Sequence, residues 1–242
     1  MSIRLTSTGI TDCWSSLIPY FSSHEKEESA LGKKIFLCLV LTLMFSLSTA
    51  AMPTSAATPP LAGVKVVVDP GHGGRDPGAV GINGLTEKQV NLQVAKALRN
   101  CLVEYGGATV EMTRVDDSYV TLAGRVKKAN DSWADRFISV HHNGSVNPDH
   151  NGTSVFSANN GSAQSHDLSA KVQKRLLQMT GLRDLGANTA NYYVLRNTRM
   201  PGILTEASFI TNPKEEEKLR DPGYVWREGY YIYRGIVDHM GN

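Results

Sequence analysis

The chain is poor in cysteine, which limits how its fold can be stabilised. Among its 242 residues only Cys13, Cys38 and Cys101 occur, and the first two lie in or before an apolar segment near the N-terminus. Cys101 is therefore alone in the rest of the chain and has no partner for an internal disulfide. It follows Val94 and Leu98 in a helical apolar pattern, which predicts a buried structural thiol rather than a nucleophile. A folded part of this kind depends on its hydrophobic core for stability.

Clusters of basic residues are also absent, as are the common phosphate-binding loops. The formal net charge is only +2, with no block of lysine or arginine, no aromatic residues interleaved with basic ones and no zinc-finger cysteine spacing. These absences argue against a nucleic-acid partner. The chain has neither the lysine spacing of a P-loop nor a GxGxxG pattern, which excludes these two nucleotide-binding motifs.

One long apolar run lies near the N-terminus. Two lysines precede residues 35–47 (IFLCLVLTLMFSL), and small residues follow directly. This order predicts a secretory signal, and hence an exported protein of the cell envelope or the extracellular space. The polar lead of residues 1–32 is longer than an ordinary signal has. Residues 1–52 are therefore read as a polar lead plus either a cleaved signal peptide or an uncleaved membrane anchor.

The rest of the chain is predicted to be one domain with alternating strands and helices. Residues 53–62 are rich in proline, threonine and alanine, as linkers are, and residues 63–242 show neither a repeat nor a second boundary. Runs rich in Val, Ile, Phe and Tyr predict six strands, at 64–69, 109–114, 136–141, 153–157, 192–196 and 202–207.

Helical patterns separate most of these strands. Thr86 and Gln89 have the spacing of a capping box, and residues 122–133 and 168–179 show further helical periodicity. Asn212 and Asp221 each precede a proline, which predicts two more helix starts. The expected fold is α/β: a mostly parallel, mixed six-stranded sheet with helices on both faces. No helix precedes the run at 153–157, so its pairing with the preceding strand is expected to be antiparallel.

Four residues with metal-binding or acid–base side chains lie where this fold would bring them together. His72 follows the first strand, Glu87 is one residue inside the next helix, and His141 and Glu206 end two later strands. The carboxyl ends of parallel strands share one edge of the sheet, where ligands bind. Two imidazoles and one carboxylate form a ligand set for a catalytic zinc, and a second carboxylate, for which we choose Glu206, can act as general base.

Each of these residues also has a structural explanation. Glu87 at a helix N-terminus can simply complement the helix dipole. One of His141 and His142 can be a core residue, because alternation along a strand points the two side chains to opposite faces. Glu206 inside an apolar strand is harder to explain without a partner, since burying an unpaired carboxylate is costly.

Around these residues the chain resembles the zinc-dependent N-acetylmuramoyl-L-alanine amidases, the family with a DPGHGG motif after its first strand. The similar blocks follow one another in order over the folded part of the chain, which makes them far more specific than a single HxH or GxG pattern. They are VVVDPGHGG (66–74), Glu87 with Asn91, MTRVD (112–116), LAGRVKKAN (122–130), ADRFISVHHN (134–143), VLR (194–196) and PGILTEASFITNPKE (201–215).

The resemblance implies one Zn²⁺ held by His72, Glu87 and His141, with Glu206 as the catalytic residue. It implies peptidoglycan as the substrate, cleaved at the amide bond between the lactyl group of N-acetylmuramic acid and the L-alanine of the stem peptide. The family commonly has alanine where this chain has His142, so His142 is not expected to be a ligand.

Asn143 and Arg196 lie near predicted strand ends and are candidates for contacts with the peptide or with the metal ligands; a surface salt bridge explains Arg196 equally well. Two other functions stay open. One is a zinc peptidase, such as a carboxypeptidase acting within the stem peptide, and the other is a non-catalytic wall-binding module. We expect a monomer whose partner is peptidoglycan, with no nucleic acid and no membrane contact except through the possible N-terminal anchor.

Overall fold

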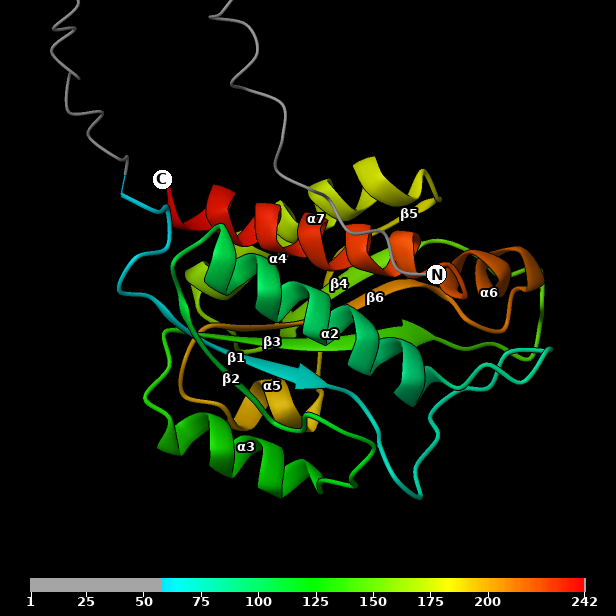
Figure 1. Ribbon diagram of the computed structural model, residues 1–242, viewed down its shortest axis with the longest axis horizontal. Helices are drawn as coiled ribbons and strands as arrows, with labels where there is room; N and C mark the ends of the chain where they lie inside the picture. The colour runs from blue at the N-terminus through cyan, green and yellow to red at the C-terminus, as the bar shows by residue number, and fades with distance from the viewer. Residues whose placement is uncertain (1–57, 242) are drawn as a thin grey trace, which may run out of the picture. The chain divides into compact units, whose positions relative to one another are not determined.

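The computed structural model describes residues 58–241, and the predicted signal or anchor lies outside this range (Figure 1). No helix in the described part of the chain is long and apolar enough to cross a membrane. The strands are β1 (Lys65–Pro70), β2 (Thr109–Met112), β3 (Arg136–Asn143), β4 (Thr153–Ala158), β5 (Asp184–Ala190) and β6 (Gly202–Phe209). The helices are α2 (Glu87–Glu104), α3 (Leu122–Asp131), α4 (Ala163–Thr180), α5 (Tyr193–Asn197), α6 (Pro213–Leu219) and α7 (Pro222–Met240).

The six strands form one mixed sheet in the order β2-β1-β3-β6-β4-β5. β2, β1, β3 and β6 pair in parallel, whereas β4 pairs antiparallel with β6 and parallel with β5. Helices α2, α4 and α7 lie on one side of the sheet, and α3 and α5 lie on the other (Figure 1). The α/β fold predicted from the sequence, with a mostly parallel six-stranded sheet covered on both faces, is confirmed.

Two details of the predicted sheet are wrong. Residues 192–196, predicted as a strand, form the N-cap (Tyr192) and the first four residues of α5, in which the adjacent apolar residues Val194 and Leu195 are both buried. The sixth strand is instead β5, an edge strand whose sequence DLGANTA contains no apolar run. The run at 153–157 does pair antiparallel, but its partner is β6 and not the preceding strand β3.

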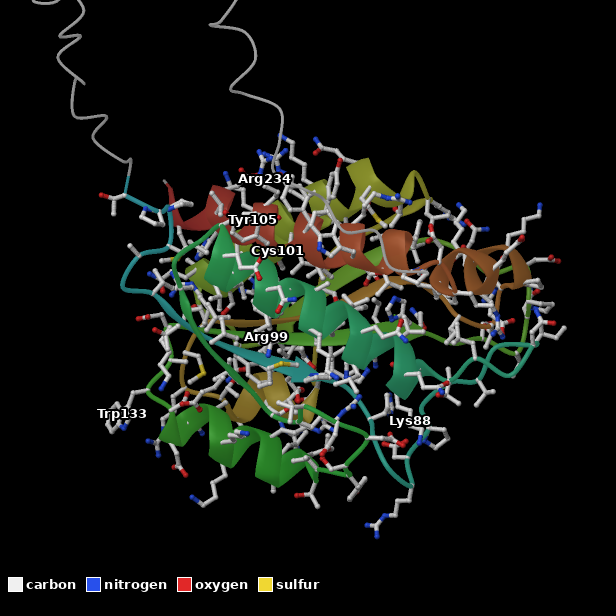
Figure 2. All side chains as sticks on the ribbon, in the orientation of Figure 1. Lys88, Arg99, Cys101, Tyr105, Trp133 and Arg234 are labelled. Atoms are coloured by element: carbon white, nitrogen blue, oxygen red, sulfur yellow. The ribbon has the colours of Figure 1, made fainter. Side chains whose placement is uncertain are left out.

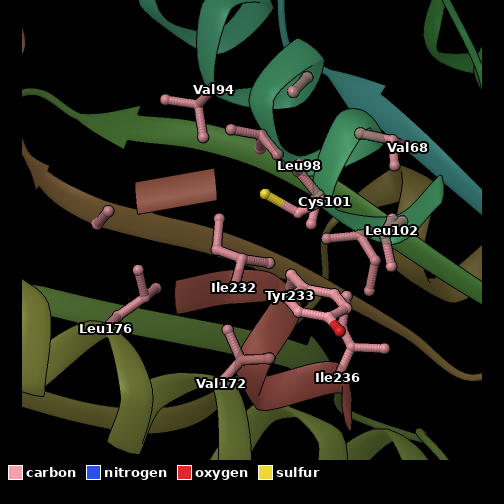
Figure 3. Packing of buried hydrophobic residues seen from close by; sticks show 14 of the residues in the cluster. Val68, Val94, Leu98, Cys101, Leu102, Val172, Leu176, Ile232, Tyr233 and Ile236 are labelled. Atoms are coloured by element: carbon pink, nitrogen blue, oxygen red, sulfur yellow. The ribbon is translucent and has the colours of Figure 1, made fainter. Parts of the chain in front are cut away.

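The larger of two hydrophobic cores lies between the sheet and α2, α4 and α7 (Figure 3). Cys101 lies within it at 1% exposure, and burial raises the pKa of its thiol to about 11, so the predicted structural thiol is confirmed. Leu61, two residues before the expected start of the domain, is also fully buried in this core. The smaller core lies under α3 and α5 and includes Phe137 and Leu204.

The predicted helix starts are present. The N–H of Thr86 donates to the side-chain oxygen of Gln89 at 3.2 Å, as in a capping box. Asn212 accepts from the N–H of Lys214 at 3.0 Å before α6, and Asp221 caps α7 in the same way. Because α2 begins at this cap, its first residue and N-terminal turn are placed at the rim of the sheet.

Glycines on α7 allow its two neighbouring helices to pack closely. A Cβ on Gly229 would lie 2.6 Å from the backbone nitrogen of Leu98 in α2, and a Cβ on Gly235 would lie 2.6 Å from the Cα of Val172 in α4. Neither position tolerates a side chain unless a helix moves. The two glycines therefore allow α7 to pack closely against both α2 and α4.

We predict that Gly229→Ala lowers the free energy of unfolding by about 1–3 kcal/mol, the usual cost of an overpacked core. Alanine is favoured over glycine in a helix by about 1 kcal/mol, so a net loss would identify the contact with α2 as the cause. Urea denaturation measures the change. The control is Gly223→Ala in the exposed first turn of α7, where the atom nearest to the new Cβ would be an oxygen of the capping Asp221 side chain at 3.3 Å. A Gly229→Ala variant more stable than the wild type by about 1 kcal/mol, the gain from helix propensity alone, would contradict the close approach.

Candidate metal centre

The loop after β1 holds His72 in a backbone conformation that few residues adopt. The φ angle of His72 is 60°, and the two glycines that follow it also have positive φ. Non-glycine residues in this region are strained and concentrate at functional sites. In this conformation His72 Nε2 lies 3.1 Å from Glu87 Oε2, while Nδ1 lies 2.9 Å from Asp76 Oδ2.

Two buried arginines hold this loop by its carbonyl groups. Arg125 donates to the carbonyls of Pro70 and His72, each at 2.6 Å. Arg114 donates to the carbonyls of Pro70 at 3.0 Å and Gly71 at 2.7 Å. Hydrogen bonds from charged donors are stronger than neutral ones, so the two guanidinium groups can maintain a strained path of the backbone.

The N-terminal turn of α2 holds the same loop from the other side. Lys88, in the first turn of α2 (Figure 2), donates from Nζ to the carbonyl of Gly74 at 2.8 Å and to Asp117 at 2.7 Å. Asp117 in turn accepts from the N–H of Gly74 at 3.0 Å. The loop that carries His72 is therefore fixed relative to the helix that carries Glu87.

Glu87, the first residue of α2, lies between the two histidines. The residue is 4% exposed, and its carboxylate has Oε1 2.9 Å from Nδ1 of His141 and Oε2 3.1 Å from Nε2 of His72. Burial by itself would raise the pKa of this carboxyl, but the hydrogen bonds and charges of His141 and His72 outweigh burial and lower it. Glu87 is therefore ionised at neutral pH.

The Glu87 carboxylate also accepts hydrogen bonds from groups behind it. Asn91 Nδ2 donates to Oε1 at 3.1 Å, and so does the backbone N–H of His142 at 3.2 Å. The N–H of Ala79 donates to Oε2 at 2.9 Å. With both oxygens held in this way, the carboxylate has one orientation toward the histidines.

His72, Glu87 and His141 can together hold a metal ion. One ligand atom from each residue lies within 4.8 Å of those of the other two. The donor set of two imidazole nitrogens and one carboxylate oxygen matches that of catalytic zinc sites, in which three protein ligands leave a position open. The residues therefore fit a zinc ion by chemistry as well as by distance.

Two glycines make room for these side chains. A Cβ on Gly71 would lie 2.2–2.6 Å from three atoms of the His141 ring. A Cβ on Gly78 would lie 2.5 Å from Glu87 Oε2 and 2.7 Å from His72 Cδ2. The glycine-rich sequence is thus needed at two positions because backbone and ligand side chains approach one another closely.

Glu206 lies beside His141 because the two residues are register partners in the pairing of β3 with β6. Its Oε2 is buried and has no hydrogen-bond partner among the described residues. Burial, together with the charge of Glu87, raises the pKa of Glu206 well above its usual value. A buried carboxyl oxygen without a partner is costly and is ready to bond to a group that enters the site.

The candidate ligands and Glu206 open into a cavity of about 340 Å³ between α3, α5 and the rim of the sheet. The lining includes both apolar side chains, such as Leu122 of α3 and Val194 of α5, and polar side chains at the rim of the sheet. The lining residues are Asp69, His72, Asp76, Glu87, Tyr119, Val120, Leu122, Arg125, His141, His142, Asn143, Gly144, Tyr192, Tyr193, Val194, Leu204 and Glu206.

The two further candidates from the sequence lie in different places. Asn143 ends β3 and lines the cavity. Arg196 does not line it and is not at a strand end, because its segment is helix α5. Its guanidinium donates to Asn191 at 3.1 Å and lies 5.4 Å from the centre of the Tyr193 ring. No salt bridge of Arg196 occurs within the described residues.

Sequence reasoning missed three residues of the site. Asp76 contacts the imidazole of His72, and its position four residues later in the same glycine-rich loop was an available signal. Tyr119 and Tyr192 line the cavity from two loops far apart in sequence. Burial and the charges of Glu206 and Glu87 raise the pKa of Tyr192. No local pattern marks either tyrosine, since both reach the site only through the tertiary fold.

The chain is similar to known proteins over most of the described residues. Residues 66–238 match the protein family described as N-acetylmuramoyl-L-alanine amidase. The chain is 36% identical over 196 residues to the N-acetylmuramoyl-L-alanine amidase LytC of Bacillus subtilis, which covers 79% of this chain and 39% of LytC. It is 38% identical over 163 residues to the sporulation-specific N-acetylmuramoyl-L-alanine amidase of the same species, covering 67% and 62% of the two chains. The matched part is thus less than two thirds of either relative.

Solved structures show the same fold. The N-acetylmuramoyl-L-alanine amidase from Clostridium difficile 630 is similar with a TM-score of 0.72 at 34% identity, covering 75% of this chain and 98% of that chain. The catalytic domain of the amidase CwlV from Bacillus (Paenibacillus) polymyxa var. colistinus gives a TM-score of 0.69 at 35% identity, with 74% and 98% covered. The structural neighbours are therefore whole chains or domains of about the size of the described part.

We predict that Gly71→Ala weakens Zn²⁺ binding about tenfold or more, the scale on which displaced support for a ligand acts. The new Cβ would overlap the His141 ring, although the backbone of Gly71 has no positive φ and so allows alanine. Competition with a chromogenic chelator measures the affinity, and circular dichroism checks that the variant is folded. Gly223→Ala is the matched control. Unchanged affinity in folded Gly71→Ala would show that His141 is not a ligand.

Proposed function

The chain belongs to the N-acetylmuramoyl-L-alanine amidase family, and on this premise we propose that it is a zinc-dependent peptidoglycan hydrolase. The bond cleaved is the amide between the lactyl group of N-acetylmuramic acid and the L-alanine of the stem peptide. The observation that carries the proposal is the convergence of His72, Glu87 and His141, with Glu206 beside them, at one end of the cavity.

In this proposal His72, Glu87 and His141 hold a single Zn²⁺. When bound there, zinc supplies a Lewis acid that polarises the amide carbonyl and lowers the pKa of water. The ionised Glu87 supplies one negative charge to the site, and its hydrogen bonds to Asn91, His142 and Ala79 leave it little freedom to turn away. Asp76 holds the His72 ring through Nδ1, which leaves Nε2 directed at Glu87 and the metal position.

Glu206 is the proposed general base and acid. Its free Oε2 takes a proton from the attacking water and then passes that proton to the nitrogen of the leaving L-alanine. The raised pKa of its carboxyl suits both steps, because it makes the ionised carboxylate a stronger base for the proton of water. Without this transfer the nitrogen of L-alanine would have to depart as an anion (R–NH⁻), which is a very poor leaving group.

The cavity is proposed to hold the substrate around the scissile bond. Tyr119 and Tyr192 offer aromatic surface, Leu122 and Val194 offer apolar surface, and the amide of Asn143 can hydrogen-bond to peptide groups. Arg196 lies outside the cavity, so a contact between Arg196 and substrate would involve parts of the stem peptide or glycan beyond it.

The remaining parts of the proposal concern the whole chain. We propose residues 1–52 as a polar lead with a signal peptide or anchor, 53–62 as a linker and 63–242 as the catalytic domain. Export follows from the nature of the substrate, since peptidoglycan lies outside the cytoplasmic membrane. The domain is expected to act as a monomer.

Digestion of purified peptidoglycan tests the activity. We expect the protein loaded with zinc to release free L-alanine amino termini and leave the glycan strands intact, as measured by mass spectrometry of the digest. A chelator should abolish the release, and added Zn²⁺ should restore it. Release of a terminal amino acid would instead indicate a carboxypeptidase, and binding without cleavage would indicate a wall-binding module. Either result would overturn the proposed amidase.

Glu206→Gln is expected to bind Zn²⁺ as the wild type does but to turn over about 10²–10⁴ times more slowly, the usual contribution of a positioned acid–base group. Glutamine keeps the size of the side chain but cannot carry the proton. Steady-state kinetics on a muropeptide and metal analysis of the same sample give the two readouts. Near-normal turnover in a zinc-loaded variant would remove Glu206 from the mechanism.

A further inference from the structure

His142 lies on the opposite face of β3 from His141 and joins a buried hydrogen-bond chain behind the metal centre. It is 1% exposed, with Nδ1 2.9 Å from Asn91 Oδ1 and Nε2 3.1 Å from Glu228 Oε2. Asn91 Nδ2 continues the chain to Glu87 Oε1 at 3.1 Å. The chain therefore runs from α7 through β3 and α2 to a carboxylate of the candidate metal centre.

The chain of hydrogen bonds has a direction. An ionised carboxylate only accepts, so Asn91 must present its NH₂ group to Glu87 and its oxygen to His142. His142 must then donate from Nδ1. The NH₂ end of the Asn91 amide has two acceptors, Glu87 Oε1 at 3.1 Å and the Gly71 carbonyl at 3.4 Å, whereas His142 is the partner of its oxygen end. Without His142 the oxygen end would lose that partner, and the amide would be held from one side. A flipped amide would place its oxygen against the Glu87 carboxylate, where the two acceptors repel each other.

A hydrophobic core does not require a buried ionisable pair, such as His142 with Glu228, for its stability. Both side chains are 0% exposed, and Glu228 Oε1 has no partner among the described residues. Two apolar side chains of similar volume often stabilise a core as well as a buried ionisable pair or better. Packing alone therefore gives no account of these two residues, whereas their contact with Asn91 does.

We propose that His142 and Glu228 are positioning residues that fix the orientation of the Asn91 amide and, through it, the Glu87 carboxylate at the metal centre. Glu228 orients the His142 ring, His142 orients Asn91, and Asn91 holds Glu87 Oε1 toward His141. This inference rests on the zinc site of the proposed function. It implies that part of the affinity of this site for Zn²⁺ depends on Glu228 of helix α7.

Zinc affinity is the first readout, measured by competition with a chromogenic chelator on folded protein. We expect His142→Ala to bind Zn²⁺ about 10–100-fold more weakly than the wild type, the range found when support for a ligand is removed. The Co²⁺-substituted protein should also show an altered visible absorption spectrum, because Glu87 is less well oriented. Wild-type affinity and spectrum in His142→Ala would overturn the proposal.

Variants of Glu228 give an independent test if His142→Ala does not fold. Glu228→Gln should keep near-normal zinc affinity, because its NH₂ group can donate to His142 Nε2 while Nδ1 still donates to Asn91. Glu228→Leu fills a similar volume without a hydrogen bond and should bind Zn²⁺ about tenfold or more weakly than the wild type. Equal zinc affinity of the two variants would contradict a positioning role for Glu228.

A double-mutant cycle tests whether His142 acts through Asn91. If it does, Asn91→Ala/His142→Ala should bind Zn²⁺ no more weakly than Asn91→Ala alone, since residues in one network are not additive. Additive losses would overturn the relay. The matched control is Ile232→Ala, also fully buried on α7, which should lower the melting temperature but leave the zinc affinity of the folded protein unchanged.

These measurements separate the inference from the function on which it rests. Zinc binding that weakens as described, in a protein that leaves peptidoglycan uncut, would overturn the amidase activity and keep the positioning role. Cleavage of peptidoglycan by the wild type, together with unchanged zinc affinity in His142→Ala, would overturn the positioning role and keep the amidase activity. A wild-type protein that binds no zinc would overturn both.

Discussion

The buried carboxylate of Glu87 is the group around which this end of the molecule is arranged. At 4% exposure it has lost most of its hydration, which would be unfavourable for a charge without compensating partners. Two imidazoles face it from one side, and one amide and two backbone N–H groups face it from the other. A carboxylate with this set of donors stays ionised, and an ionised carboxylate between two histidines is an electrostatically favourable place for a divalent cation.

The partners of Glu87 come from separate parts of the chain, and each reaches the rim for a different physical reason. His72 is placed by a strained loop whose carbonyls are held by Arg114 and Arg125. His141 is placed by the parallel pairing of β3, and Glu206 by its register opposite His141. The close approach at Gly71 then lets the His141 ring lie against the loop. The site thus depends on sheet register and on glycine positions together.

The sequence predicted the parts of this arrangement that follow from period and topology. Alternation separated His141 from His142, and the rule that parallel strands end at one edge brought His72, Glu87 and His141 together. The prediction from sequence failed where tertiary packing determines the local structure. Residues 193–196, predicted as part of a strand, belong to the short helix α5, which packs on the sheet. The edge strand β5 was missed because its polar sequence carries no hydrophobic pattern. The tyrosines of the cavity were missed for the same reason, because only long-range contacts place them there.

Because side chains alternate along β3, its two adjacent histidines lie on different faces of the sheet and have different roles. The side chains of His141 and Glu206 lie at the cavity, where a substrate can enter. The side chain of His142 is 0% exposed and is bonded to Asn91 and Glu228 in the core, although the residue also borders the cavity. A shift of one residue in the β3 register would put Val140 in the place of His141 at the metal centre or, in the other direction, Asn143 in the place of His142 beside Glu228. A shift in either direction would remove the imidazole from one of the two faces, so both the metal centre and the buried hydrogen-bond chain depend on the native register. The chemistry on one face and the packing on the other are therefore selected by the same backbone pairing.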